Sequence, residues 1–221
     1  MIKERLIGYI EQSITQNWEI EALSNYKEKG MSYKEIAGKM LRMHIFFRDA
    51  GIREGDKIAL VGRNSANWCI TYLATVTYGA VIVPILPDFK PDDLANLVNH
   101  SDATLLFADD KLYESIDPAK IPQIIGVVSV DTFKLITAKD ESLKINFDSL
   151  EEKYLKAYPE LKKEDIKFSD ISNDKLAVIS YTGGTTGFSK GVMLSHNSLA
   201  ANVRYAQANM PLNPGDPLVS F

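Results

Sequence analysis

The sequence contains five short, almost entirely apolar runs, separated by segments with helical or strongly polar patterns. A strand that is apolar on both faces has to be covered on both faces, which is typical of parallel strands joined by helical crossovers. The runs lie at 56–62, 80–86, 103–108, 123–130 and 175–182. They predict an α/β fold with a largely parallel sheet covered by helices on both faces.

Helix signals lie between these runs. Ser32 and Glu35 have the spacing of a capping box, in which each side chain satisfies a free amide of the first helical turn. Gly51 predicts the end of the helix that begins there. Pro91 is typical of a first helical turn and predicts a helix that ends near His100. Helical spacing also marks an opening helix and one face of the second helix: Ile2, Leu6, Ile10 and Ile14, then Ile36, Met40, Met43 and Phe47.

The composition excludes several classes of protein. The 221 residues are 45% hydrophobic and 24% charged, which is typical of a soluble globular protein. A formal net charge of −4 argues against a nucleic-acid partner. The single cysteine, Cys69, lies in an apolar helical run, so we expect an inert thiol and a reducing compartment. The apolar run at 80–86 contains Pro84 and is far shorter than the ~20 residues of a spanning helix. We expect no transmembrane segment and a cytoplasmic location.

Composition divides the chain into three parts. Within 1–221 we expect an α/β body at 1–137, a charged surface connection at 138–174, and a strand, loop and helix at 175–221. In the connection, Ser149 and Glu152 have the spacing of a second capping box. Three side chains of the connection are expected to hold that short helix on the body: Leu150, Tyr154 and Leu155. Its remaining mixed charges predict a solvated surface.

The most unusual stretch of the chain is SYTGGTTGFSKGVMLSH, which begins at Ser180 and ends at His196. It follows the last apolar run and precedes a helical pattern, and a strand, a glycine-rich turn and then a helix is where an open α/β sheet binds ligands. Glycines allow positive φ and close backbone approach, and successive amides in such a turn accept anions. A cation ~4 Å from a phosphate gains about 4 kcal/mol before desolvation, so Lys190 should dominate the electrostatics. The pattern predicts a polyphosphate ligand.

Two other interpretations of this stretch were weighed. A hairpin or connector would be glycine-rich because it turns sharply, but it gains nothing from three threonines and a lysine. A Walker A loop requires G-K-[ST], whereas Ser189 precedes Lys190 and Gly191 follows it. The Walker interpretation is therefore excluded.

These residues resemble the phosphate-binding signature of the adenylate-forming (AMP-binding) superfamily, usually written [YF]-T-S-G-T-T-G-x-P-K-G-V. The upstream segments MSYKEIAGKM, GIREGDKIALVGRNSANW and TYLATVTYGAVIVPILP are similar to further segments of that family, so the resemblance covers nearly the whole chain. Among its members, long-chain fatty-acyl-CoA synthetases look most similar. The resemblance implies the N-terminal portion of the adenylate-forming ligase large domain. Gly183 and Ser189 replace the usual serine and proline, which predicts a less pre-organised loop.

The resemblance implies a two-step reaction. A substrate carboxylate, such as that of a fatty acid, attacks the α-phosphorus of ATP and expels pyrophosphate, and coenzyme A then takes the acyl group. Lys190 is the implied catalytic residue, with Mg²⁺ sharing the charge, although the sequence assigns no metal ligands. The residues implied to wrap the β- and γ-phosphates are Thr182, Gly183, Gly184, Thr185, Thr186, Gly187 and Lys190.

Later family motifs, which hold adenine and ribose and supply a catalytic lysine, do not occur in these 221 residues. We therefore expect an N-terminal fragment of a longer ligase that is inactive by itself and binds ATP weakly. The alternative is a short, non-catalytic binding or interaction module derived from this family. Ser195 is expected to cap the last helix, and His196 to orient its start. His44 is expected to be structural, and Ser65 and Trp68 to begin a helix with a packing role.

Overall fold

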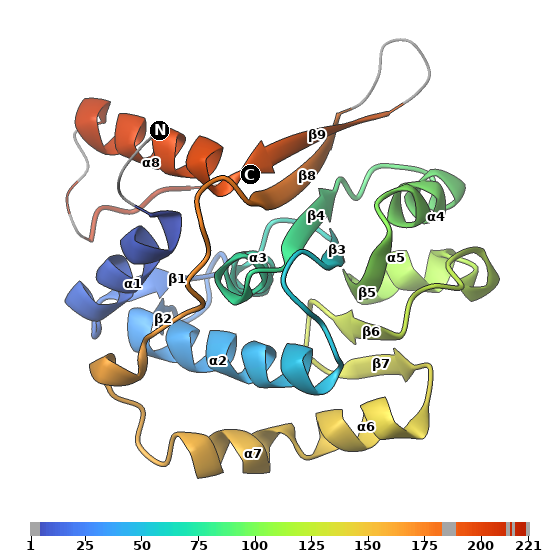
Figure 1. Cartoon of the computed structure of the whole chain (residues 1–221), viewed down its shortest axis with the longest axis horizontal. Coiled ribbons are helices and arrows are strands. Elements are labelled where there is room, and N and C mark those ends of the chain that lie inside the picture. The colour runs from blue at the N-terminus through green and yellow to red at the C-terminus, as the bar shows by residue number, and fades with distance from the viewer. Residues whose placement is uncertain (1–4, 183–188, 211–212, 214, 220–221) are drawn as a thin grey trace.

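The computed structural model describes residues 5–182, 189–210, 213 and 215–219 (Figure 1). A seven-stranded sheet has the order β7-β6-β5-β3-β4-β8-β9, in which the five inner strands are parallel and β7 and β9 run antiparallel at the two edges. A separate hairpin pairs β1 with β2. The strands are β1 (Glu21–Leu23), β2 (Met31–Ser32), β3 (Lys57–Val61), β4 (Val81–Ile85), β5 (Ala103–Ala108), β6 (Gly126–Ser129), β7 (Leu135–Ala138), β8 (Leu176–Thr182) and β9 (Lys190–Ser195).

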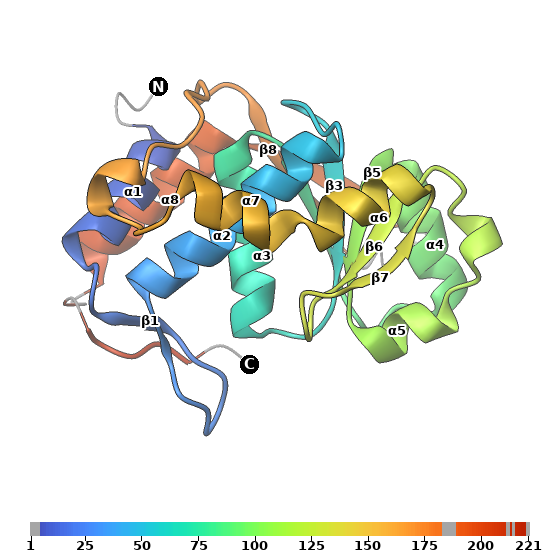
Figure 2. The same ribbon diagram turned by 90° about the horizontal axis from the view of Figure 1, so that it is seen from below.

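Helices cover both faces of this sheet (Figures 1 and 2). Helices α1, α2, α3, α6 and α7 pack with one buried cluster, and α4 and α5 pack with the other. Alternate residues of β3 point to opposite clusters, with Ile58 and Leu60 on one side and Ala59 and Val61 on the other. The helices are α1 (Leu6–Gln16), α2 (Tyr33–Asp49), α3 (Ala66–Tyr78), α4 (Pro91–His100), α5 (Asp110–Ser115), α6 (Glu141–Asp148), α7 (Leu150–Ala157) and α8 (His196–Asn209). The expected α/β architecture is confirmed.

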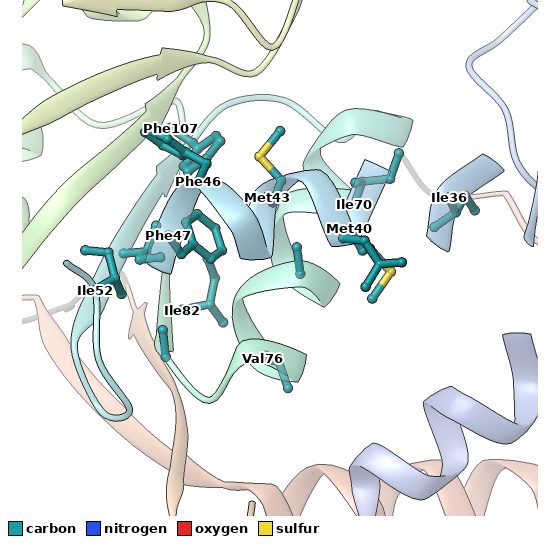
Figure 3. Close-up of a cluster of buried hydrophobic side chains, with 14 of the residues drawn as sticks. Ile36, Met40, Met43, Phe46, Phe47, Ile52, Ile70, Val76, Ile82 and Phe107 are labelled. Carbon is teal, nitrogen blue, oxygen red and sulfur yellow. The ribbon is translucent and has the colours of Figure 1, made fainter. Parts of the chain in front are cut away.

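Helix α2 is the long helix at the centre of the larger cluster. The capping box at its start is present, because Glu35 N–H donates to Ser32 Oγ at 3.2 Å and Ser32 N–H donates to Glu35 Oε2 at 2.7 Å. Its predicted face is buried, and Phe47 meets Phe107 of β5 edge to face with ring centroids 6.1 Å apart (Figure 3). Gly51 follows the helix with φ +78°, a conformation that favours glycine.

Helix α3 begins at the predicted place and packs on α2. Trp68 N–H donates to Ser65 Oγ at 3.1 Å, and the Trp68 ring stacks on Tyr72. Cys69 is half-buried, and burial raises the pKa of its thiol, in agreement with the expected inert role. His44 of α2 lies against this helix, with Nε2 2.9 Å from the carbonyl oxygen of Ala74. Burial lowers the pKa of His44 to about 4, so its role is structural as expected.

Several expectations for the charged connection are wrong. Ser149 does not cap α7; its hydroxyl instead donates to the Ile145 carbonyl at 2.8 Å, because an unpredicted helix, α6, ends directly before it. Leu150 and Tyr154 are buried as predicted, but Leu155 is 52% exposed. The segment 160–174 is not wholly solvated either, since three of its residues are buried: Ile166, Ile171 and Asn173.

The three-part division of the chain stays a prediction. Within the described residues, no helix combines the length and the hydropathy that crossing a bilayer would require.

Candidate functional site

The glycine-rich stretch connects two antiparallel strands that form the end of the sheet. Strand β8 pairs with β9 along its length, and the ladder runs from Leu176↔Ser195 to Thr182↔Lys190. The expectation that a helix follows the turn directly is therefore wrong, because β9 intervenes. The part of the alternative interpretation that predicted a hairpin is correct. Strand β9 was difficult to predict from the sequence because four of its residues are exposed. The alternation of apolar and polar residues that identifies a half-buried strand is therefore missing.

The structure brings Thr182 and Lys190 together as the last residue pair of the ladder, on either side of the glycine-rich connection. They are cross-strand partners, and both side chains are exposed. Opposed residues of an antiparallel pair have Cβ atoms about 5 Å apart, so a ligand at this end can meet both side chains. The other predicted site residues, Gly183, Gly184, Thr185, Thr186 and Gly187, lie outside the described residues.

The charge of Lys190 is available to a ligand. Among the ion pairs of the described residues, none involves its ammonium group. Thr182 stands at the carboxyl end of β8, and the parallel strands β3, β4 and β5 end at the same edge of the sheet (Figure 1). Open α/β sheets bind ligands at this edge.

Tyr181 anchors the base of the hairpin, and the sequence had not singled it out. Its hydroxyl lies 2.7 Å from Nδ1 of His100, at the end of α4, and its side chain is 4% exposed. Burial raises the pKa of Tyr181, so the phenol remains neutral. Its position one residue before Thr182 could have identified it. Neighbouring residues of a strand point to opposite faces, so an outward-facing Thr182 implies an inward-facing Tyr181.

Gly191 lies opposite Tyr181 on β9. A Cβ atom there would come within 3.1 Å of Ile179 Cγ2 and 3.2 Å of Tyr181 Cε1. The glycine after Lys190 therefore lets the two strands pack closely around the tyrosine ring.

The far end of β9 is anchored to the body. Ser198 N–H donates to Ser195 Oγ at 3.2 Å, which confirms the predicted helix cap. His196 is fully buried, and its backbone N–H donates to the Lys175 carbonyl at 3.0 Å. Burial lowers the pKa of His196. His196 directly follows β9, at the other end of that strand from Lys190. Its buried ring is compatible with the expected role of orienting the start of α8.

The described residues contain no group of three or more histidine, cysteine, aspartate or glutamate side chains that could hold a metal ion. A magnesium ion held mainly by substrate phosphates needs only one or two protein carboxylates, so this finding is compatible with one that enters with a nucleotide. The hairpin as described thus presents an exposed lysine and threonine on strands that are hydrogen-bonded to the body at Tyr181 and His196.

Comparison with known proteins shows the family. Residues 10–221 match the family described as AMP-binding enzyme. The medium-chain fatty-acid–CoA ligase of Escherichia coli (strain K12) is 30% identical over 173 residues, which are 73% of this chain and 28% of that protein. The long-chain-fatty-acid–CoA ligase of Bacillus subtilis (strain 168) is 24% identical over 203 residues, which are 86% of this chain and 36% of that protein.

Solved structures agree with the sequence relatives. A long-chain-fatty-acid–CoA ligase from Archaeoglobus fulgidus shares 26% identity with a TM-score of 0.70, over 93% of this chain and 39% of that chain. An anthranilate CoA ligase in complex with anthranoyl-AMP has a TM-score of 0.76 at 16% identity, which shows the fold alone. The chain spans about a third of the length of these relatives and matches the N-terminal part of adenylate-forming ligase structures. It therefore belongs to the AMP-binding enzyme family and forms part of the ligase domain found in acyl-CoA synthetases.

Proposed function

We propose that this chain is the phosphate-binding part of an ATP-dependent ligase that joins a fatty acid to coenzyme A. The observation that carries the proposal is the last ladder pair of the hairpin, where Thr182 and Lys190 are exposed cross-strand partners and no acidic side chain among the described residues pairs with Lys190. Polyphosphate is the anion class that suits a lysine beside a glycine- and threonine-rich turn. Within the proposal, Gly183, Gly184, Thr185, Thr186 and Gly187 supply the remaining contacts to the β- and γ-phosphates.

The proposed reaction has two displacement steps. A carboxylate oxygen of the fatty acid attacks the α-phosphorus of ATP, and the bond to the bridging oxygen breaks, which releases pyrophosphate. The thiol sulfur of coenzyme A then attacks the acyl carbon, AMP leaves and the thiol proton passes to solvent. Lys190 neutralises charge as pyrophosphate departs, which is a positioning and electrostatic role. Bound Mg²⁺ would share that charge, and we assign none of the described residues to the metal or to coenzyme A.

The fatty-acid substrate rests on the relatives. Two of them are named as medium-chain and long-chain fatty-acid–CoA ligases. A third, 28% identical over 196 residues, is named as a peroxisomal long chain acyl-CoA synthetase of Arabidopsis thaliana. The cytoplasmic location stays a prediction, which fractionation of the producing cells would test.

A calorimetric titration of the 221-residue chain with inorganic tripolyphosphate tests the phosphate site. We expect Lys190→Ala to weaken binding about tenfold or more, because one charge contact to phosphate is lost. Lys163→Ala is the matched control, since Lys163 is an exposed lysine of the charged connection. Equal affinity of the two variants would overturn the assignment of Lys190.

A second measurement concerns catalysis. We expect no exchange of pyrophosphate into ATP by the 221 residues alone, because they span about a third of the length of their relatives. Exchange at the rate of a full-length relative would contradict this expectation, while tripolyphosphate binding tests the site independently of turnover.

A non-catalytic interaction module is the second candidate function. The observation that favours it is a set of exposed apolar side chains on β9 and α8: Met193 is 69% exposed, Tyr205 70% and Val192 43%. Failure of tripolyphosphate to bind at all, together with capture of a protein partner that Met193→Lys abolishes, would favour the module over the ligase.

A further inference from the structure

A surface groove lies between α2 and α7. Helix α7 lies on the side of the molecule away from the β8–β9 hairpin (Figure 1). The volume of the groove is about 680 Å³. Small-molecule sites typically measure about 300–1,000 Å³, so the α2–α7 groove has the size of a ligand site. Its lining contains no residue of the hairpin.

The floor of the groove is apolar. Met43 and Leu150 are buried at its base, and Phe147 packs edge to face on the core residue Phe46 with centroids 5.0 Å apart. Met31 and Leu161 extend the apolar lining towards its ends. The floor is therefore a continuation of the hydrophobic core to the surface, which suits an alkyl chain.

Some of the charged side chains that line the groove already have partners. Arg42 makes a bidentate ion pair with Glu151, from Nε to Oε2 at 2.7 Å and from Nη2 to Oε1 at 2.8 Å, and its guanidinium lies 3.5 Å from the ring centroid of Tyr154. Glu35 accepts the Ser32 amide in the capping box of α2. The other charged lining residues have no ion pair among the described residues: Lys34, Lys39 and Asp148.

The ammonium of Lys39 has no ion pair or hydrogen bond among the described residues, although the side chain is half-buried. It lies near the Phe133 ring, whose centroid is 5.4 Å from Nζ. Burial and the neighbouring Arg42 lower the pKa of Lys39, and the charge of Glu35 opposes this shift. A charge that is partly removed from water and has no direct ion pair gains from an anion that can reach it.

We propose that the α2–α7 groove binds a linear fatty acid, with its carboxylate on the Lys39 ammonium and its alkyl chain along the apolar floor. A singly charged head group fits better than a phosphate, because two further carboxylates line the groove, those of Glu35 and Asp148. Repulsion from these acids grows with the charge of the ligand. The site is distinct from the one at the hairpin and does not depend on it.

The test is a titration of the 221-residue chain with dodecanoate below its micelle concentration, followed by calorimetry and by amide chemical shifts. We expect saturable binding with shifts confined to α2 and α7, and about tenfold weaker binding of dodecanol, which lacks the carboxylate. Lys39→Met should weaken dodecanoate binding about tenfold, while Lys39→Arg keeps the charge and should retain the affinity.

Lys156→Met is the matched control, since Lys156 is an exposed lysine of α7 that does not line the groove. Its affinity should equal that of the unmodified chain, and far-ultraviolet circular dichroism checks that each variant is folded. No saturable binding, shifts that map to β9 and α8 instead, or equal affinity of Lys39→Met and Lys156→Met would each overturn the proposal.

Discussion

The centre of the sheet and the edge strand β9 are held by different forces. Strands β3 and β4 pair over five residues each, and the side chains of Ile58, Leu60 and Ile82 are completely buried. Strand β8 of the hairpin shares this core, because it pairs with β4 at Ile82↔Val178 and its residues Ala177 and Val178 are buried. The central strands and β8 are thus stabilised by burial, whereas the edge strand β9, with four exposed residues, is held mainly by its ladder with β8.

Polar contacts also hold the two ends of the hairpin. Tyr181 is bound to His100 at one end, and the backbone of His196 is bound to the Lys175 carbonyl at the other. Its outer strand carries Met193, 69% exposed. The comparison teaches that Thr182 ends a strand that is buried in the core, whereas Lys190 begins an exposed edge strand.

The largest expected effect compares Phe47 of α2, which packs on the central strand β5, with a side chain of the edge strand β9. Phe47→Ala should lower the free energy of unfolding by about 3–5 kcal/mol, because it leaves a cavity in the core. Val192→Ala on the exposed edge strand should change it by less than about 0.5 kcal/mol. Urea denaturation measures both. Phe47→Leu, which fills most of the cavity, is the control, and similar losses for the two alanine variants would end the distinction between the regions.

The pH dependence of the free energy of unfolding should come mainly from His44, a residue of α2. The pKa of His44 is about 4 in the folded protein and 6.5 when unperturbed, so the unfolded chain binds more protons between these values. Stability should fall by about 3 kcal/mol as the pH drops from 6.5 to 4. His196 contributes with the same sign, since burial also lowers its pKa.

His44→Gln keeps an N–H donor for the Ala74 carbonyl and cannot titrate. Chemical denaturation at several pH values should give a flatter profile for this variant than for the unmodified chain. A profile of unchanged steepness would show that other groups control the acid sensitivity.

The smallest expected effect compares two helix caps. Ser32→Ala should cost about 1 kcal/mol of global stability, because α2 is packed into the core. Ser195→Ala removes a similar cap from α8, where half of the residues are exposed, so the loss should appear as faster amide hydrogen exchange in α8 alone. A global loss from Ser195→Ala would show that α8 unfolds together with the central sheet.

Much of the fold could be predicted because its signals are local. The apolar run at 103–108 became strand β5 with the same bounds, and Ser32 and Glu35 formed the expected capping box. Pro91 and His100 bound α4 as predicted. Burial on both faces and free amides at helix ends impose the same residue choices in any context.

Other features could not be predicted because they depend on what lies nearby in space. Ser149 had the right spacing for a cap, but the end of α6 took its hydroxyl. Leu155 had an apolar side chain on a helix whose packed face was already filled by Leu150 and Tyr154. Strand β9 paired with β8 despite its exposure, since a ladder needs backbone groups and not a buried face.

For this protein the sequence by itself determined the alternation of buried strands and helices, the helix starts, and a lysine beside a glycine- and threonine-rich turn. Only the tertiary structure decided that this turn closes a hairpin, that Tyr181 is held by His100, and that Lys39 faces an apolar groove without a partner. The physical reason is the distance along the chain between the residues that determine each feature. Burial patterns and caps are written in neighbouring residues, whereas the partner of a side chain is chosen by residues far away along the chain.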